Sequence, residues 1–158
     1  MTTRNRFLDE AIALALANVQ DGGRPFGAVV VKDDRIIARG VNRMQAEHDP
    51  TAHAELLALR AAGQALRSTR LDGCAVYASG QPCPMCLAAM RMAGIHDITF
   101  AYSNAQAEPF GLSTAAIAAE LARPLDQQPG LSLRHEPQQV PDEDHLYRIW
   151  QRRTARQP

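Results

Sequence analysis

Residues 74–94 read CAVYASGQPCPMCLAAMRMAG, and this segment indicates the fold class. Cys74–Ser79 is a short, mostly apolar run, which is typical of a buried strand. Two prolines introduce the following residues and Gly94 ends them, so we expect a helix over Pro84–Ala93. A buried strand that leads directly into a helix is the unit from which α/β sheets with parallel neighbours are built.

The rest of the chain continues this alternation. Apolar residues recur at helical spacing from Phe7 to Leu16, which predicts a helix that ends near Gly22-Gly23. Two β-branched runs that meet at Asp33-Asp34 predict a hairpin. The remaining expected elements are strands over Gly27–Lys32, Arg35–Val41, Asp97–Tyr102 and, weakly, Leu131–His135, and helices over His53–Leu66, Ser113–Leu121 and His145–Ala155.

This order predicts an α/β fold with one five-stranded mixed sheet and helices on both of its faces. The chain has 158 residues, of which 46% are hydrophobic, so it can bury a sizeable core. We therefore expect a single domain over residues 1–158. The Pro124–Gly130 segment has the composition of a surface loop rather than of a linker between domains.

Composition excludes several classes of protein. The 17 basic and 17 acidic side chains cancel, so the chain as a whole does not attract nucleic acid. No apolar run approaches the ~20 residues of a membrane span, and no secretion signal is visible. The three cysteines are too few for a disulfide framework and favour a reducing compartment. These features predict a cytoplasmic protein that does not bind membranes.

Two short segments carry candidate chemistry, Thr51–Glu55 and Gln81–Cys86. Cys83 and Cys86 form a Cys-x-x-Cys pair at the expected start of a helix, where thiolates are favoured. His53 offers a third ligand from the start of another helix. Three nitrogen and sulfur ligands suit zinc and leave a fourth position open for water, which is the pattern of a catalytic zinc site.

Glu55 lies two residues after His53. On a regular helix these side chains would point about 200° apart, so they share a site only if His53 lies in an irregular first turn. A carboxylate that stands beside the metal without binding it can transfer a proton. The alternatives for the cysteine pair are a redox dithiol and half of a structural zinc site. The ordered His-x-Glu and Pro-Cys-x-x-Cys pattern favours catalytic zinc over both.

With these residues the chain resembles the zinc-dependent cytidine deaminase superfamily. Within it, the chain looks most like the bacterial guanine deaminases, on the motifs Pro25–Val29, Asp49–Glu55 and Pro82–Leu87. The tRNA adenosine deaminases share His48–Glu55. They typically carry a stretch rich in Lys, Thr, Gly and Ala after the fourth strand, and residues 104–111 lack it here.

The resemblance implies a three-layer α/β/α sandwich of the cytidine deaminase type, a homodimer and one zinc ion per subunit. It implies His53, Cys83 and Cys86 as zinc ligands and Glu55 as the proton shuttle. Asn42 and Phe26 match residues that contact the substrate base. The sequence departs from the family pattern at Gln81, where Glu is usual, and at Gly111–Thr114, where guanine deaminases carry an acidic pair.

These observations predict a zinc-dependent hydrolytic deaminase of a small-molecule nucleobase or related amino-heterocycle, with guanine as the first substrate to test. Three alternatives remain. One is a tRNA adenosine deaminase, whose RNA partner would meet a basic helix end formed by Arg148, Arg152, Arg153 and Arg156. The second is a cytosine or other heterocycle deaminase of the same fold. The third is a non-catalytic zinc domain.

Overall fold

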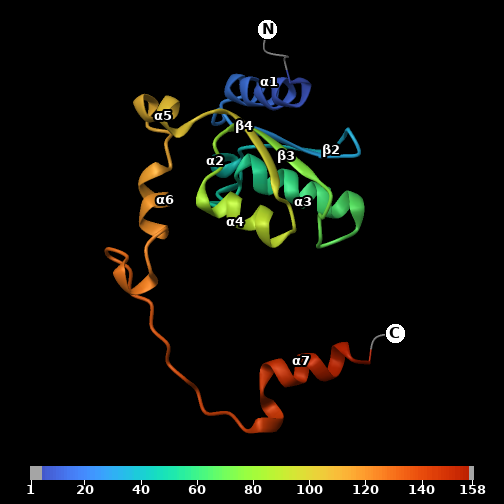
Figure 1. Cartoon of the computed structure of the whole chain (residues 1–158), viewed down its shortest axis with the longest axis vertical. Helices are drawn as coiled ribbons and strands as arrows, with labels where there is room; N and C mark the ends of the chain where they lie inside the picture. Colours follow the sequence, from blue (N-terminus) through green and yellow to red (C-terminus); the bar gives the residue numbers. More distant parts are fainter. Residues whose placement is uncertain (1–4, 157–158) are drawn as a thin grey trace. The chain divides into compact units, whose positions relative to one another are not determined.

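The computed structural model describes residues 5–156. The chain forms two compact units, Met1–Pro124 and Leu125–Pro158. The first unit holds a four-stranded sheet (Figure 1) whose strands are β1 (Gly27–Lys32), β2 (Arg35–Val41), β3 (Ala75–Gly80) and β4 (Asp97–Tyr102).

The strand order is β2-β1-β3-β4. Strand β1 is antiparallel to both β2 and β3, and β3 is parallel to β4. Asp33 and Asp34, with φ values of 50° and 61°, form the two-residue turn of the β1–β2 hairpin. Two successive left-handed residues match the right-handed twist of the paired strands. The predicted hairpin is thus confirmed, and its strands have the bounds expected from the sequence.

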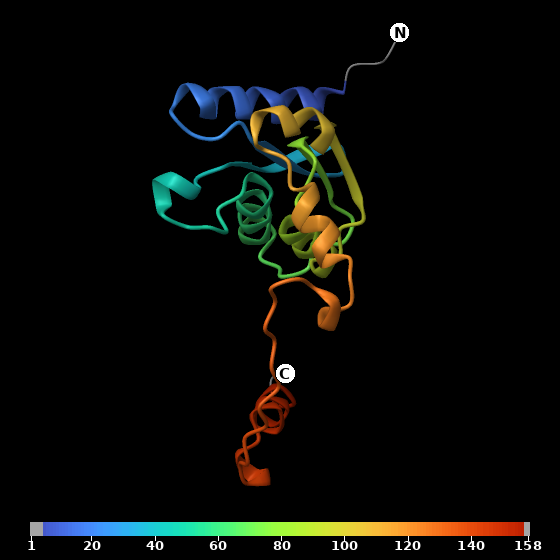
Figure 2. The same ribbon diagram turned by 90° about the vertical axis from the view of Figure 1, so that its left-hand side faces the viewer.

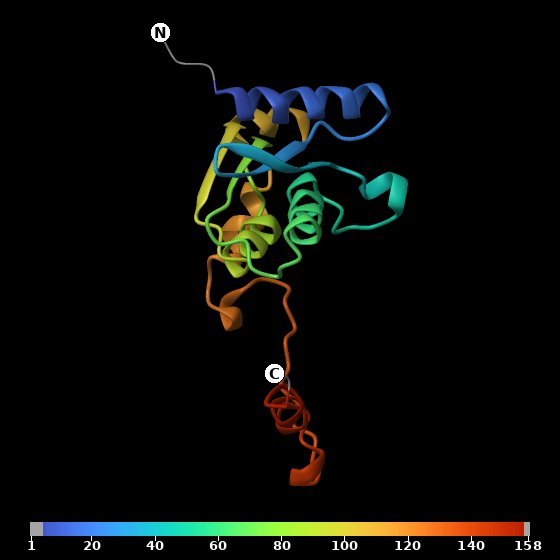
Figure 3. The ribbon, with the colours of Figure 1, turned by 90° about the vertical axis from the view of Figure 1, so that its right-hand side faces the viewer.

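Helices cover both faces of the sheet. Helix α1 (Arg6–Gln20) lies on one face, and α3 (Ala54–Leu66) and α4 (Pro84–Met92) lie on the other (Figure 2, Figure 3). Successive side chains of a strand point to opposite faces. In β1, Val29 and Val31 accordingly pack with Phe7 of α1, whereas Ala28 and Val30 join the larger cluster with α3 and α4.

Local chemistry explains where these helices begin. The side chain of Asn5 caps α1 by accepting hydrogen bonds from the backbone N–H groups of Phe7 and Leu8. Pro84 occupies the first turn of α4, where its missing N–H has no cost. Gly40 lets β2 approach α3, because a Cβ there would lie 2.6 Å from the Ala58 amide nitrogen. The start of α3 is therefore seated directly against the sheet.

The predicted fifth strand at Leu131–His135 is wrong. These residues belong to the second unit, are exposed and pair with no strand in the described part of the chain. An alternating pattern stabilises a strand only where a neighbour completes its hydrogen bonds. Three short elements were not predicted, because one turn shows no periodicity: α2 (Met44–Glu47), α5 (Asn104–Ala107) and the 3-10 turn η1 (Glu108–Phe110).

The remaining helices follow the prediction closely. Helix α6 spans Ala115–Leu121 in the first unit. In the second unit, α7 (Leu146–Thr154) follows the 3-10 turn η3 (Asp142–Asp144), which follows the shorter turn η2 (Leu125–Gln127). No helix among residues 5–156 is long and apolar enough to cross a membrane.

Candidate metal and catalytic site

The three predicted metal ligands come together at the N-termini of two helices. His53 is the N-cap residue of α3, Cys83 is the N-cap residue of α4, and Cys86 lies in the first turn of α4. The Nδ1 atom of His53 lies 3.4 Å from the Sγ atom of each cysteine, and the two Sγ atoms are 3.6 Å apart. Residues far apart in the sequence thus present three ligand atoms to one point.

The spacing of these atoms fits zinc. Zinc bonds of about 2.0–2.3 Å in a tetrahedral arrangement place neighbouring ligand atoms about 3.5–3.8 Å apart. The observed distances of 3.4–3.6 Å need only a small expansion to reach that range. Within the described residues, no fourth His, Cys, Asp or Glu joins this candidate metal cluster. The donor set therefore leaves one coordination position for a water molecule or substrate.

The three candidate ligands share protons with one another. Hydrogen bonding from the Cys86 thiol lowers the pKa of Cys83 to about 4, and His53 acts in the same direction. The pKa of Cys86 is raised, because its thiol donates to Cys83 and is buried. The hydrogen bond with Cys83 raises the pKa of His53. A divalent cation displaces the protons held on His53 and Cys86 and binds the deprotonated ligands.

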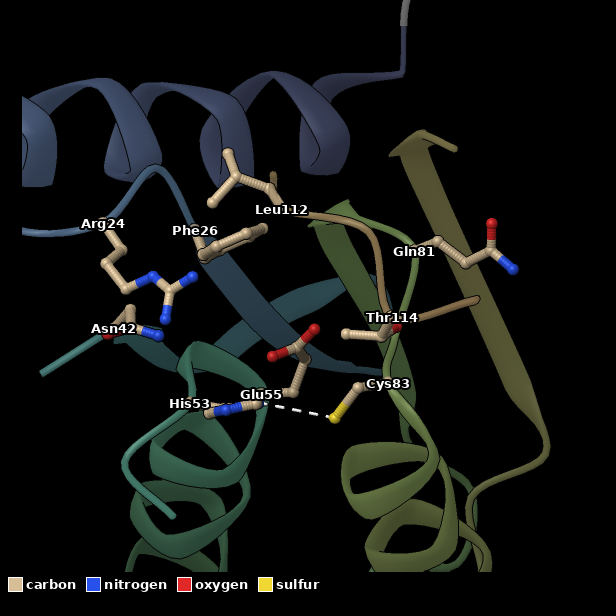
Figure 4. Close-up of a pocket in the computed structure, with 9 residues that line it drawn as sticks. All are labelled: Arg24, Phe26, Asn42, His53, Glu55, Gln81, Cys83, Leu112 and Thr114. Carbon is tan, nitrogen blue, oxygen red and sulfur yellow. Dashed lines mark hydrogen bonds between the residues drawn. The ribbon is translucent and has the colours of Figure 1, made fainter. Parts of the chain in front are cut away.

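Glu55 joins the site because His53 is not helical. His53 has φ −72° and ψ 152°, which is an extended conformation, and Ala54 is the first residue of α3. Because His53 is extended, its side chain and that of Glu55 do not point about 200° apart as they would on a regular helix. This is the condition that the sequence set for a shared site. The Glu55 side chain points into the same pocket as His53 and Cys83 (Figure 4). Its Oε2 atom lies 3.5 Å from the Sγ atom of Cys86.

The environment of Glu55 suits proton transfer. Only 7% of the residue is exposed, and burial raises the pKa of its carboxyl group above the ordinary value of 4.5. A carboxyl group whose pKa moves toward neutrality both accepts and returns a proton efficiently near neutral pH. The position and the electrostatics of Glu55 therefore agree with a role as general acid and base.

A short polar turn holds the segment before α3. The Oδ1 atom of Asp49 accepts hydrogen bonds from the backbone N–H of Thr51 at 2.8 Å and from its hydroxyl at 2.7 Å. These hydrogen bonds lower the pKa of Asp49. The backbone N–H of His53 donates to the carbonyl of Thr51 at 2.8 Å. This turn fixes the extended backbone that aims the His53 ring at the two cysteines.

A cavity of about 190 Å³ opens above the candidate metal ligands (Figure 4), and it is lined by Arg24, Phe26, Asn42, His53, Glu55, Gln81, Cys83, Leu112 and Thr114. Both residues expected to contact a substrate base lie in this wall. Asn42 is buried, and its Oδ1 accepts a hydrogen bond from the backbone N–H of Met44. Its Nδ2 has no acceptor among the described residues, so it is available to a ligand. The Phe26 ring lies against Gly80, where a Cβ would come within 3.2 Å.

Gln81 connects the cysteine segment to the far wall of the pocket. Its Oε1 atom accepts a hydrogen bond from the backbone N–H of Asn104 at 2.9 Å. The Oδ1 atom of Asn104 in turn accepts from the backbone N–H of Thr114 at 3.2 Å. The departure from Glu at this position thus supplies a neutral acceptor for a backbone amide. We call Gln81, Asn104 and Thr114 the polar relay.

Arg24 is a pocket residue that the sequence analysis missed. It lies in the loop between α1 and β1, two residues before Phe26, and its guanidinium carbon is 5.9 Å from the centre of the Phe26 ring. Loop residues carry no periodic signal. The available hint was its place inside the Gly22–Phe26 turn, directly before residues that carry the family resemblance.

Comparison with known proteins adds independent information. The family model of the cytidine and deoxycytidylate deaminase zinc-binding region matches residues 1–102. This span contains all four residues of the metal and catalytic cluster, His53, Glu55, Cys83 and Cys86. Its end coincides with the last residue of β4.

Guanine deaminases and tRNA adenosine deaminases are among the relatives of the chain. The chain is 42% identical to guanine deaminase of Bacillus subtilis over 123 residues. These residues are 77% of this chain and 79% of that protein. The X-ray structure of guanine deaminase from Bacillus subtilis matches with a TM-score of 0.79 and 35% identity, over 94% of this chain and 95% of that one. A tRNA-specific adenosine deaminase of Agrobacterium fabrum is 39% identical over 100 residues, which are 63% of this chain and 66% of that protein.

Proposed function

Because the chain belongs to the cytidine and deoxycytidylate deaminase zinc-binding family, we propose that it hydrolyses the exocyclic amine of a free nucleobase, with guanine as the substrate. The observation that carries this proposal is the meeting of His53, Glu55 and the two cysteines beneath one small pocket. A redox dithiol needs neither the histidine nor the carboxylate. A structural zinc site needs no buried Glu55 and is normally closed by a fourth ligand.

The chemistry divides between the metal ligands and Glu55. His53, Cys83 and Cys86 would hold a zinc ion, which would supply the Lewis acid that makes a water molecule more acidic. Glu55 takes a proton from that water and delivers it to the ring nitrogen beside the carbon that bears the amine. Proton delivery makes this carbon electrophilic, and the water oxygen bonds to it. Glu55 then passes the second water proton to the amine nitrogen, the C–N bond breaks, and ammonia leaves a carbonyl group behind.

The pocket walls hold the base in register with Glu55. The Phe26 ring offers an apolar surface on which a heterocycle can lie, and the free Nδ2 of Asn42 can donate a hydrogen bond to it. The cavity of about 190 Å³ is smaller than the roughly 300–1,000 Å³ of sites for drug-sized ligands. This size favours one heterocyclic base without an attached sugar phosphate.

Guanine is favoured over the base of a tRNA by the extent of the likeness. In sequence, guanine deaminase of Bacillus subtilis matches 77% of this chain, whereas the tRNA enzyme of Agrobacterium fabrum matches 63%. The guanine deaminase structure matches 94% of this chain, and so includes residues beyond the family region. The basic end of α7 is also partly neutralised within its own unit. Arg148 pairs with Asp142 at 2.7 Å, and the Nη2 of Arg152 donates to the carbonyl of Glu143 at 3.0 Å.

The experiment is ammonia release by the zinc-loaded protein from a panel of free bases and nucleosides. Guanine heads the panel, with adenine, adenosine, cytosine and cytidine beside it and Glu55→Ala as the control. We expect guanine turnover by the native protein and its loss in the variant. Turnover of cytosine or cytidine alone would contradict the choice of guanine and keep the chemistry. Full activity of Glu55→Ala would contradict the mechanism.

The assembly and the compartment are also proposals. Met85, Leu87 and Met92 expose apolar side chains on α4, and such a surface supports a homodimer. Light scattering of the purified protein should then give twice the mass of one chain. None of the three cysteines forms a disulfide, which supports a cytoplasmic location.

A further inference from the structure

Arg24 brings an uncompensated positive charge to the wall of the catalytic pocket. The residue is half-buried, lines the cavity with Phe26 and Asn42, and lies beside both of them (Figure 4). Among the described residues, no carboxylate forms an ion pair with its guanidinium. The one side-chain hydrogen bond that it makes within residues 5–156 is weak, 4.0 Å from Nη1 to the Sδ of Met44. The donors of the guanidinium are therefore available to a ligand.

The backbone of Arg24 is held firmly, although the residue lies in a loop. Its carbonyl accepts hydrogen bonds from the Nδ2 of Asn18 at 2.7 Å and from the backbone N–H of Phe26 at 2.8 Å. The same Nδ2 of Asn18, which is buried, donates to the carbonyl of Asn42 at 2.9 Å. One buried amide thus ties Arg24 and Asn42 to the same wall. These hydrogen bonds fix the backbone at both residues, so both side chains start from defined positions in the pocket wall.

The polarity of this wall restricts what a substrate can present to it. Arg24 and the free Nδ2 of Asn42 offer hydrogen-bond donors, and arginine has no acceptor. On the other side of the pocket, Glu55 exchanges protons with the reacting atoms and does not accept from this edge of the substrate. The substrate edge that faces this wall must therefore carry acceptors. A guanidinium can donate two parallel hydrogen bonds to two adjacent acceptors. The carbonyl oxygen O6 and the ring nitrogen N7 of guanine form such a pair.

We propose that Arg24 is the residue that selects oxo-purines. Its guanidinium donates hydrogen bonds to the carbonyl oxygen O6 and to the ring nitrogen N7 of the base, while the 2-amino group faces Glu55. This inference rests on the proposed function. It predicts discrimination between guanine and 2,6-diaminopurine, which carries the same 2-amino group but replaces the carbonyl oxygen with a second amine. A donor then faces the donors of Arg24, and a site built for hydrogen bonding rejects such an analogue strongly.

The test compares kcat/KM for guanine and for 2,6-diaminopurine in zinc-loaded proteins. Arg24→Leu should lower the guanine to 2,6-diaminopurine ratio about 10- to 100-fold, the range expected for one bidentate arginine contact. Arg24→Lys retains the charge but loses the planar fork, so its ratio should lie between those of the native protein and Arg24→Leu. Arg35→Leu is the matched control, because Arg35 is exposed at the start of β2, away from the pocket lining. It should keep the native ratio.

The outcomes separate this inference from the proposed function. An unchanged ratio in Arg24→Leu, with native guanine turnover, would overturn the role of Arg24 and keep the function. A native protein that holds zinc but deaminates neither purine would overturn both. A native preference for guanosine monophosphate over guanine that Arg24→Leu abolishes would assign Arg24 to a phosphate and overturn its role at the base. If Arg24→Leu fails to fold, Arg24→Gln keeps a polar side chain without the charge or the guanidinium fork and tests the same ratio.

Discussion

The two sides of the catalytic pocket are built from different kinds of structure. On the metal side, His53, Glu55, Cys83 and Cys86 lie at the starts of α3 and α4, which pack against the sheet. On the facing side, Arg24 comes from the loop before β1, and Leu112 and Thr114 come from the segment between η1 and α6. Helix starts therefore position the residues of the metal side, whereas loops position those of the facing side.

This difference teaches where the chemistry and the choice of substrate reside. The metal side follows the family pattern at every residue that bears on proton transfer or metal binding. The facing side departs from it, because Gly111–Thr114 lacks the acidic pair of guanine deaminases. Loops tolerate such changes better than packed helices. We therefore expect substitutions on the metal side to abolish the reaction and those on the facing side to change its substrate.

The largest effect should come from Cys83→Ala. Loss of one thiolate leaves two protein ligands, which is fewer than a catalytic zinc site uses. We expect both zinc content and guanine deamination to fall below detection, measured by metal analysis and ammonia release. Cys74→Ala is the control, since Cys74 is a buried core residue outside the metal cluster. Zinc binding at native stoichiometry in Cys83→Ala would show that the ligand set is misassigned.

Glu55→Ala should separate catalysis from metal binding. Removing a positioned acid and base typically costs about 10²–10⁴-fold in rate, and Glu55 is not needed to hold the metal. We expect kcat to fall by that factor while zinc content stays native. If the variant instead loses zinc together with activity, Glu55 is a metal ligand, and its assignment as a proton-transfer group that does not bind the metal is wrong.

Zinc retention should depend on pH with a defined sign. The pKa of His53 is raised above 6.5, so below that pKa a proton competes with zinc for the ring nitrogen. The affinity for zinc should fall as pH falls, by at least about tenfold for each unit below the pKa of His53. Competition with a chromophoric chelator between about pH 5 and 8 measures this dependence. Affinity that is flat across the window would contradict the role of His53.

A smaller effect is expected from breaking the polar relay. Asn104→Ala removes the acceptor for the backbone N–H of Thr114 but keeps the hydrogen bond from its own backbone to Gln81. The loss of one hydrogen bond of about 1 kcal/mol should raise KM for guanine about fivefold. Zinc content and kcat should change little, which distinguishes this variant from those on the metal side. Glu108→Ala, at the exposed C-cap of the same short helix, is a suitable control.

The metal side was largely predictable from sequence, and the facing side was not. The His-x-Glu spacing required a non-helical His53, and its extended backbone confirms that reasoning. The strands β1, β2 and β4 have their predicted bounds because their apolar runs are bounded by turn residues. Arg24 could not be assigned in this way. Its backbone is held at the pocket by a hydrogen bond from Asn18, and a contact of this kind produces no periodic pattern in the sequence.

The position of His53 and Cys83 at the N-caps of their helices has a mechanical consequence. Neither side chain caps its own helix, so the first amide groups of α3 and α4 lack that restraint. An ion shared between the two would act as a removable cross-link that closes a loop of chain and limits fraying of both helices. Chelation should therefore accelerate hydrogen–deuterium exchange at these two helix starts together, while amides of the central strand β1 exchange as slowly as before.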